Sequence, residues 1–319
     1  MLEISVKPEV EKTSNIKVIG VGGAGNKAIT RMKQDGIDYV ELIGVNTAVK
    51  DLSTCEGTIL QIGEKLTHGL GAGAKPQVGE KAAEESRAEL ENAVAGADMV
   101  IVTCGMGGGT GTGASPVIAD LAKKKGILTV GVVTKPFGFE GSVRRKNAEQ
   151  GIQRLKDTAD AMIVIPNDKL LAVADKNMTS QEAYRKGDEV LRQTIQTITE
   201  IINVPADINV DMADITTVMR NKGLAYTGIG DAKGDQKAIR AMEMAITSPF
   251  LETNVRQASD VIISITGDIT LYDAKEAVNH IACKTSLNTN IIFGFRYDVS
   301  TPDACRISVI ATGIQSKLV

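Results

Sequence analysis

Residues 105–113, with the sequence GMGGGTGTG, combine glycines and hydroxyl side chains at a spacing suited to binding phosphate. Glycine has no Cβ, so backbone N–H groups in such a run can approach an anion closely. An apolar run at 99–102 precedes it, and apolar residues spaced like one helix face follow over 117–122. A helix that starts there adds free N–H groups and the positive end of its dipole. We therefore expect a phosphate loop, with Thr110 and Thr112 as further hydroxyl donors.

A flexible linker and a P-loop are weaker interpretations of this glycine run. A flexible linker is seldom placed between a buried strand and a helix. A P-loop ends in Gly-Lys followed by Ser or Thr, and the sequence contains no Gly-Lys dipeptide. The run is therefore expected to be a phosphate loop of another kind.

A second glycine pattern, G-x-G-x-x-G at 20–25, follows a strand predicted at 16–21. It matches the fingerprint of dinucleotide-binding folds, which is a weak signal alone. Those folds also need an acidic residue at the end of the second strand to hold the ribose. The strand predicted at 40–45 ends in Asn46 instead. A nicotinamide dehydrogenase therefore stays open only as a disfavoured alternative.

Strands and helices alternate through the first half of the chain, which predicts a parallel sheet with helices on both faces. Several glycine loops would then meet at one edge of the sheet and form a single nucleotide pocket. One of them is the loop at 69–76, which leads into a helix predicted over 79–97. The fold class is thus α/β, with a Rossmann-like domain, a long central helix and a second, smaller α/β domain. The strands of the first domain are predicted at 16–21, 40–45, 58–62, 99–102, 128–133 and 161–165.

The strongest helix pattern covers 179–202. Thr179 and Glu182 form a capping box, and apolar residues recur at helical spacing after them. Tyr184 and Asp188 are four residues apart and so share a face. Tyr184 could stack on a purine, and Asp188 could accept hydrogen bonds from guanine N1 and N2 while repelling the acceptor edge of adenine. By spacing alone, however, an ordinary surface pair is the simpler interpretation.

Asp211 and Asp214 lie three residues apart where a loop enters a helix whose apolar face includes Ile215 and Val218. Two carboxylates on one face could polarise a water molecule or help to hold a cation. Helix capping is the simpler interpretation of the pair, because Asp is favoured in a first helical turn.

The last third of the chain repeats an α/β pattern without a glycine phosphate loop. This unit is therefore expected to make contacts rather than to carry chemistry. Its strands are predicted at 224–229, 261–266, 290–297 and 306–312, and its helices at 236–247 and 272–283.

Composition excludes several classes of protein. The net charge of −3 gives no electrostatic footprint for nucleic acid. No apolar run reaches the length of a membrane span, so direct membrane insertion is not expected. The N-terminus lacks a signal-peptide pattern, and the 4 cysteines have no metal-like spacing. We expect a cytoplasmic protein with free thiols.

The sequence GGGTGTG at 107–113, followed by Ala-x-Pro, resembles the loop that marks tubulins. Its flanks, at 105–106 and 130–137, resemble FtsZ, the prokaryotic relative of tubulin, and the similarity runs from about residue 16 to 314. The resemblance implies a tubulin/FtsZ fold that binds GTP or GDP with Mg²⁺ on the phosphates, and K⁺ is a further candidate ion. It implies a GTP-binding domain at 16–178, the central helix at 179–203 and a GTPase-activating contact domain at 204–319, and the polar N-terminal residues 1–15 are expected to form a short disordered arm.

The same resemblance assigns roles within the pocket. Asn26 and Asn167 would read the base, Glu140 would hold the ribose, and Arg144 would lie near the phosphates. The loop at 69–76 would sense the terminal phosphate. The implied nucleotide contacts are Gly22, Gly23, Asn26, Ala72, Gly73, Ala74, Gly105, Gly107, Gly108, Gly109, Thr110, Gly111, Thr112, Gly113, Pro136, Glu140, Arg144, Asn167, Tyr184 and Asp188.

The chain departs from the family pattern at two positions near the phosphates. Family members usually carry Asn-Thr-Asp where this chain has Asn-Thr-Ala at 46–48. Ala48 therefore removes a carboxylate near the phosphates and metal. Family members usually carry Asn-Pro where this chain has Lys75, which is expected to bring a cation close to the γ-phosphate. The sequence stops at Val319, before the linker and the adaptor-binding peptide that usually follow in the family, so either it is cut there or the protein lacks them. Metal dependence and hydrolysis rate are therefore open.

The first domain offers no obvious residue to orient an attacking water. The resemblance gives that role to Asn209, Asp211 and Asp214. These residues follow the central helix, which rises about 1.5 Å per residue and would place them roughly 30 Å or more from the base. They could serve the nucleotide of a neighbouring subunit stacked head to tail, and such contacts make filaments. We therefore expect a GTPase that polymerises with itself, with a role in the division ring and other division-apparatus proteins as candidate partners. A slow or non-hydrolysing GTP-binding filament or regulatory protein is the alternative.

Overall fold

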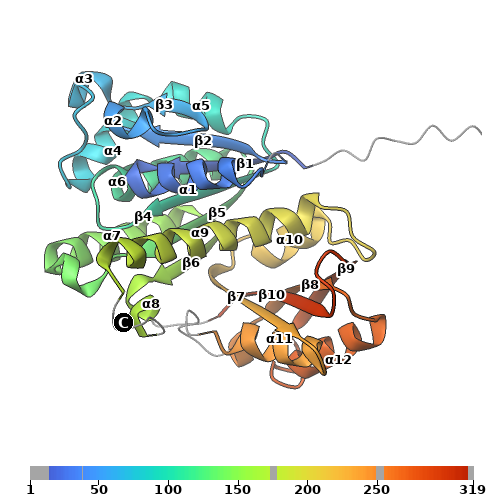
Figure 1. Ribbon diagram of the computed structural model, residues 1–319. Helices are drawn as coiled ribbons and strands as arrows, with labels where there is room; N and C mark the ends of the chain where they lie inside the picture. Colours follow the sequence, from blue (N-terminus) through green and yellow to red (C-terminus); the bar gives the residue numbers. More distant parts are fainter. Residues whose placement is uncertain (1–13, 38, 173–177, 249–254, 315–319) are drawn as a thin grey trace, which may run out of the picture.

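The computed structural model describes residues 14–37, 39–172, 178–248 and 255–314. Their strands form a single 10-stranded sheet in the order β3-β2-β1-β4-β5-β6-β7-β10-β8-β9 (Figure 1). The arm expected to be disordered at 1–15 falls almost wholly outside the described residues.

The first part of the sheet is parallel, as its alternating pattern predicted. Strand order reverses between β1 and β4, so the loops that leave these two strands open a crevice at the carboxyl edge of the sheet. This order is shared with dinucleotide-binding folds and does not by itself separate the two classes. The strands are β1 (Ile16–Val21), β2 (Glu41–Asn46), β3 (Thr58–Gln61), β4 (Met99–Gly105), β5 (Leu128–Lys135) and β6 (Ala161–Pro166).

Helices cover both faces of this parallel sheet, each over its own apolar core. Successive side chains of a strand point to opposite faces, so Ile19 of β1 lies in one core and Val18 in the other. The helices are α1 (Gly22–Gln34), α2 (Val49–Leu52), α3 (Glu64–Thr67), α4 (Pro76–Glu85), α5 (Arg87–Val94), α6 (Thr110–Lys124), η1 (Gly138–Glu140), α7 (Ser142–Thr158) and α8 (Asn167–Ala172).

The prediction of a single helix over 79–97 is wrong. The segment forms two helices, α4 and α5, which are separated at Ser86, where the backbone leaves the helical region with ψ 31°. The Ser86 hydroxyl accepts a hydrogen bond from the backbone N–H of Gly63 at 3.1 Å.

The central helix α9 (Ser180–Asn203) crosses the middle of the molecule between the two units (Figure 1). Its predicted capping box is confirmed, since Thr179 Oγ1 accepts from Glu182 N and Glu182 Oε2 accepts from Thr179 N at 2.8 Å. Leu191, Ile195 and Ile198 are buried on one face, as the helical spacing predicted. The first turns of α9 are largely exposed, so burial increases along the helix.

The C-terminal unit extends the same sheet. Residues Ala161, Met162 and Ile163 of β6 pair in parallel with residues 223–225 of β7, a continuity that the sequence pattern did not predict. Strand β10 lies antiparallel between β7 and β8, and β9 is parallel to β8. The elements are α10 (Met212–Met219), β7 (Gly223–Lys233), α11 (Lys237–Ile246), η2 (Val255–Gln257), β8 (Asp260–Gly267), α12 (Leu271–Ala282), β9 (Asn290–Tyr297) and β10 (Ala304–Thr312).

Among the described helices, none combines the length and the apolar character that crossing a membrane requires.

Candidate functional site

A cavity of about 570 Å³ opens at the crevice between β1 and β4. The loops that follow β1, β2, β3, β4, β5 and β6 all reach it, and the start of α9 closes one side. Its lining residues are Val21, Gly22, Gly23, Ala24, Lys27, Asn46, Ala48, Asp51, Leu70, Gly71, Ala72, Ala74, Gly105, Met106, Gly108, Gly109, Thr110, Gly111, Thr134, Pro136, Glu140, Arg144, Asn167, Tyr184, Gly187 and Asp188.

Two helix N-termini face this cavity through glycines. Gly22 has φ +72°, and a Cβ there would lie 2.9 Å from the backbone nitrogen of Gly111, so the two loops pack backbone against backbone. Helices α1 and α6 both begin without a side-chain cap, which leaves their first N–H groups free. Free N–H groups and the positive ends of two dipoles favour the binding of an anion at this end of the cavity.

The two threonines of the glycine loop behave differently. Thr110 lines the cavity, and its hydroxyl lies 2.7 Å from the hydroxyl of Thr47. Thr112 is buried, and its hydroxyl accepts from the backbone N–H of Gly107 at 2.8 Å. Thr112 does not line the cavity, so its expected donation to phosphate finds no support in this geometry and stays a prediction.

The opposite end of the cavity is formed by aromatic and amide side chains. The Tyr184 ring packs edge-on against Phe137, with ring centroids 5.3 Å apart. Asn167 begins α8, and its buried Oδ1 has no hydrogen-bond partner in the described part of the chain. A Cβ at Gly187 would lie 3.1 Å from this oxygen, so the glycine keeps α9 close to Asn167. A buried acceptor without a partner is costly, which points to a ligand donor at this end.

Asp188 lies beside these groups and is paired with Arg31 of α1. Arg31 Nη2 is 3.4 Å from Asp188 Oδ2, and Arg31 Nη1 donates to the backbone oxygen of Arg185 at 3.1 Å. Burial raises the pKa of the Asp188 carboxyl, and the charges of Arg31 and Lys27 oppose that shift. The ion pair thus helps to keep a half-buried carboxylate charged.

Glu140 and Arg144 form a second ion pair on the cavity wall. The other oxygen of Glu140 accepts from the backbone N–H of Phe137 at 2.9 Å. Burial, followed by the Glu140 charge, raises the pKa of Tyr184. These contacts keep the 137–144 segment against the start of α9.

Asn209, Asp211 and Asp214 are not among the residues that line the cavity. They lie beyond the last turn of α9, whose 24 residues span about 36 Å, and α10 lies at that far end in Figure 1. Asp211 Oδ1 accepts from Asp214 N at 2.8 Å, and Asp214 Oδ2 accepts from Asp211 N at 3.2 Å. The capping interpretation is therefore correct, but it uses only one oxygen of each carboxylate.

The loop that carries these acids is attached to the C-terminal unit. Ile208 and Phe295 exchange backbone hydrogen bonds of 3.0 Å, and Asp207 accepts from the backbone N–H of Tyr297 at 2.7 Å. Asn209 Oδ1 accepts from Ala206 N at 2.8 Å and closes the turn. The exposed Asp211 side chain is thus presented on a braced loop.

Comparison with known proteins agrees with this arrangement. Residues 15–175 match the Tubulin/FtsZ family, GTPase domain, and residues 223–315 match the FtsZ family, C-terminal domain. An FtsZ dimer from M. jannaschii, described as empty, is 42% identical over 96% of this chain and 90% of that one, with a TM-score of 0.91. The chain belongs to the FtsZ family.

Two further solved structures share the fold over nearly the whole chain. A point mutant of M. jannaschii FtsZ gives 42% identity over 95% of this chain and 92% of that one, with a TM-score of 0.90. CetZ2 from Haloferax volcanii, a GTPγS-bound protofilament, is 21% identical over 95% and 94%, with a TM-score of 0.82, and shows the fold alone. As an FtsZ/tubulin-family GTPase, the protein binds guanine nucleotide through its GTPase domain.

Most of the nucleotide contacts implied by the FtsZ resemblance line the one cavity, and a few do not. Asn26 lies behind the wall, where its amide donates to Gly20 O at 3.0 Å and accepts from Asn46 at 2.7 Å. It braces two strand ends, so its expected contact with the base finds no support in this geometry and stays a prediction. The others outside the lining are Gly73, Gly107, Thr112 and Gly113.

Lys75 also differs from expectation. Its side chain is exposed and does not line the cavity, so the expected cation beside the γ-phosphate is not placed there. The cavity contains Lys27 and Asp51 instead, which no sequence pattern had singled out. Lys27 is one helical turn beyond Gly23, and this spacing could have suggested it.

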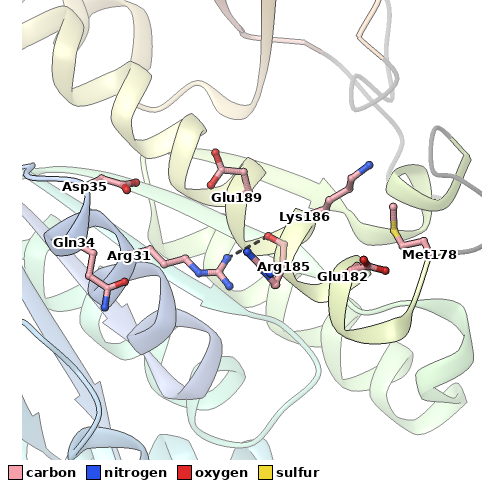
Figure 2. Close-up of a pocket in the computed structure, with 8 residues that line it drawn as sticks. All are labelled: Arg31, Gln34, Asp35, Met178, Glu182, Arg185, Lys186 and Glu189. Atoms are coloured by element: carbon pink, nitrogen blue, oxygen red, sulfur yellow. Dashed lines mark hydrogen bonds between the residues drawn. The ribbon is translucent and has the colours of Figure 1, made fainter.

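A larger cavity of about 770 Å³ lies on the outer side of Arg31, between α1 and α9 (Figure 2). It is lined by side chains of both charges, so it offers no single-sign field to a ligand. Its lining residues are Arg31, Gln34, Asp35, Met178, Glu182, Arg185, Lys186 and Glu189. Arg31 therefore stands between this groove and the nucleotide-side carboxylate Asp188.

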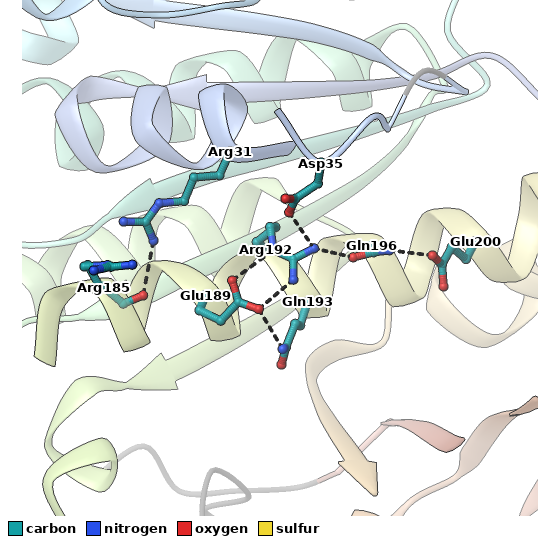
Figure 3. Close-up of polar contacts among 8 residues, drawn as sticks. All are labelled: Arg31, Asp35, Arg185, Glu189, Arg192, Gln193, Gln196 and Glu200. Carbon is teal, nitrogen blue, oxygen red and sulfur yellow. Dashed lines mark hydrogen bonds and ion pairs between the residues drawn. The ribbon is translucent and has the colours of Figure 1, made fainter. Parts of the chain in front are cut away.

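Further along α9, a chain of polar contacts attaches the helix to α1 (Figure 3). Arg192 pairs with Glu189 at 2.6 Å and reaches Asp35, directly after α1, at 3.0 Å. Arg192 also donates to Gln196 at 2.5 Å, which continues the chain toward Glu200. The contact with Asp35 attaches α9 to the nucleotide domain, and the other contacts, within α9, orient the Arg192 side chain.

Proposed function

We propose that this FtsZ-family GTPase polymerises head to tail and hydrolyses GTP at the junction between subunits. One observation carries the proposal: the nucleotide cavity and the pair Asp211/Asp214 lie at opposite ends of α9 within one chain. A subunit cannot bring its own acids to its own nucleotide over that distance. A neighbour stacked along the same axis can.

The cavity suggests one orientation for GTP. The free N–H groups near Gly22 and Gly109 would take the phosphates, since anions bind at helix N-termini. Glu140 would accept from the ribose, and Tyr184 would stack on the base. Asp188 would accept from guanine N1 and N2, while the unpaired Asn167 Oδ1 would accept a further donor of the ligand.

Exposed apolar residues occur near both ends of the proposed junction. Leu70 lines the cavity mouth with its side chain almost fully exposed, and Val143 follows the 137–141 segment. On the C-terminal unit, Tyr272 and Tyr297 are exposed. Two different surfaces that associate make a heterologous contact, which continues as a filament when it does not close. The protofilament form of CetZ2 and the FtsZ dimer are consistent with such association.

The chemistry is transfer of the γ-phosphoryl group to water, with GDP as the leaving group. The free carboxylate oxygens of Asp211 and Asp214 would orient and polarise that water. The described residues contain no cluster of three acidic, His or Cys side chains that could hold a metal. Mg²⁺ would therefore depend on the phosphates for most of its ligands, and it would neutralise charge that develops on them.

The decisive test uses two defective variants. Asp211→Ala should keep GTP binding and lose turnover. Gly108→Leu should fold, because no atom lies within 4 Å of a Cβ at this position, but should block the cavity. If the site is shared, a mixture of these two inactive proteins recovers phosphate release, because Asp211→Ala supplies the nucleotide and Gly108→Leu supplies the acids. A mixture that co-sediments but stays inactive contradicts the proposal.

A second candidate function is a GTP-binding filament that hydrolyses slowly or not at all. The methyl group of Ala48 at the cavity favours it, because family members usually carry a carboxylate there. Sedimentation with GTP but without release of phosphate at high protein concentration would support this alternative. A role in the division ring, binding of other division-apparatus proteins, assistance by K⁺ and the division of the chain at 16–178, 179–203 and 204–319 remain parts of the proposal.

A further inference from the structure

Asp51 is a carboxylate at the phosphate end of the cavity that the resemblance does not assign. It lies on α2, three residues after Ala48, and residues three apart share one side of a helical turn. Both residues line the cavity. A Cβ built on Gly23, in the first turn of α1, would lie 3.3 Å from Asp51 Oδ2, so the carboxylate faces the start of that helix.

The surroundings of Asp51 differ from those of the other two acids on the cavity wall. Glu140 is paired with Arg144 and Asp188 with Arg31. Asp51 has no cation within ion-pair distance in the described ranges, and its one side-chain hydrogen bond there as an acceptor is a long one, 3.3 Å from Asn46 Nδ2. The same amide nitrogen donates to Asn26 at 2.7 Å, so Asn46 is itself held in place.

An unpaired carboxylate beside a phosphate site has a clear electrostatic consequence. Bound triphosphate would bring several negative charges close to Asp51, and like charges at short distance repel. The arrangement becomes favourable when a cation lies between the carboxylate and the phosphates. Mg²⁺ is usually held by one or two carboxylates together with substrate phosphates and water, and the donor set here, one carboxylate oriented by an amide, fits that pattern.

The geometry points to Asp51 as the acidic group that acts on the phosphate-bound Mg²⁺, in place of the carboxylate missing at Ala48. This inference rests on the proposed binding of GTP in the cavity. It gives Asp51 opposite effects under two conditions. With Mg²⁺ the carboxylate strengthens nucleotide binding, and without a divalent cation it weakens binding.

The test measures GTP affinity by calorimetry, at protein concentrations too low for sedimentation, in Mg²⁺ and in EDTA. For Asp51→Asn, the gain in affinity on adding Mg²⁺ should shrink roughly ten- to hundredfold, the usual cost of losing a group that supports a metal. Its affinity in EDTA should equal or exceed that of the wild type. The double variant Ala48→Asp/Asp51→Asn should regain the Mg²⁺ effect.

Glu89→Gln is the matched control, because it removes one negative charge from an exposed position outside the cavity. It should behave as the wild type. The inference is overturned if Asp51→Asn keeps the full Mg²⁺ gain, if it loses affinity equally in both conditions, if the control shows the same change, or if the double variant stays at the level of Asp51→Asn. If the wild type fails to bind GTP in either condition, the proposed function itself fails.

Discussion

Arg31 of α1 and Asp188 of α9 form an ion pair with a nitrogen-to-oxygen distance of 3.4 Å. The pair connects the helix that follows the first glycine loop with the helix that leads to Asp211. Arg31 also binds the backbone of α9 at Arg185, so the contact joins both the side chain and the main chain of that helix. One guanidinium group therefore holds both the carboxylate that we propose to bind guanine and the first turns of α9.

Replacing Arg31 by Ala should shift the pH dependence of GTP binding. Burial already raises the pKa of Asp188, and Arg31 opposes this, so its loss raises that pKa further. Only the ionised carboxylate accepts from both guanine donors, so affinity falls as pH drops through the Asp188 pKa. For Arg31→Ala this fall should begin at a higher pH than in the wild type. Measuring the GTP affinity of both proteins between pH 5 and 8 checks this shift. Profiles of the variant and the wild type that superimpose would contradict the prediction.

Gly187→Ala should weaken GTP binding without weakening helix α9. Alanine favours a helix over glycine by about 1 kcal/mol, so the thermal midpoint without nucleotide should hold or rise. The new Cβ would lie 3.1 Å from Asn167 Oδ1 and push this amide from its place. We expect GTP affinity to fall roughly tenfold, a change of about 1.4 kcal/mol. Differential scanning fluorimetry with and without GTP measures both, and unchanged affinity would exclude the assigned role of Asn167.

Gly113→Ala and Gly108→Ala should fail in different ways. A Cβ at Gly113 would lie 2.0 Å from the backbone oxygen of Pro76, so α4 and α6 would have to separate. We expect a loss of roughly 2 kcal/mol or more of unfolding free energy, as for other overpacked sites. At Gly108 the Cβ meets no atom within 4 Å, so the fold should be kept while the methyl group enters the cavity. Urea unfolding measures the stability of both variants, and calorimetry measures their GTP affinity. A stable Gly113→Ala or a Gly108→Ala that unfolds easily but binds GTP normally would contradict these roles of the two glycines.

Arg192→Ala should weaken the attachment of α9 to α1. Hydrogen bonds from Arg192 lower the pKa of Glu189 below its usual value. A depressed acid pKa contributes stability that is present above the unfolded pKa and is lost as pH falls through the folded one. The variant should therefore lose roughly 1 kcal/mol or less at neutral pH, since the network is partly exposed, and show a shallower decline below about pH 4.5. Gln193→Ala, which removes a neighbouring contact to Glu189 at 2.7 Å, is the milder comparison.

Much of the first domain could be predicted because its strands are short apolar runs that alternate with helical patterns, and two of them, β1 and β4, lead into glycine loops. Those runs appear as β1, β4, β5 and β6 within a few residues of the predicted bounds. The division at Ser86 could not be seen, because no Gly or Pro marks it locally, and the backbone that Ser86 contacts, at Gly63, is far away in the sequence. The pairing of β6 with β7 was missed for the same reason, since strand neighbours are not encoded in local periodicity.

For the site, sequence patterns identified backbone-rich loops better than side-chain directions. Thr112 and Lys75 were expected to face the phosphates, but the first turns inward to Gly107 and the second points to solvent. Asp51 was overlooked because no motif marks it. Its relation to the cavity appears only once α2 is folded beside α1.

The pairing of Ala161, Met162 and Ile163 with residues 223–225 also has a mechanical meaning. Helix α9 and this seam of main-chain hydrogen bonds both connect the cavity side of the molecule with the unit that carries the acids. Both connections are built on main-chain hydrogen bonds, so tension along a row of such molecules should stretch each one very little. A change at one end would then be felt at the other as a small tilt of a stiff body.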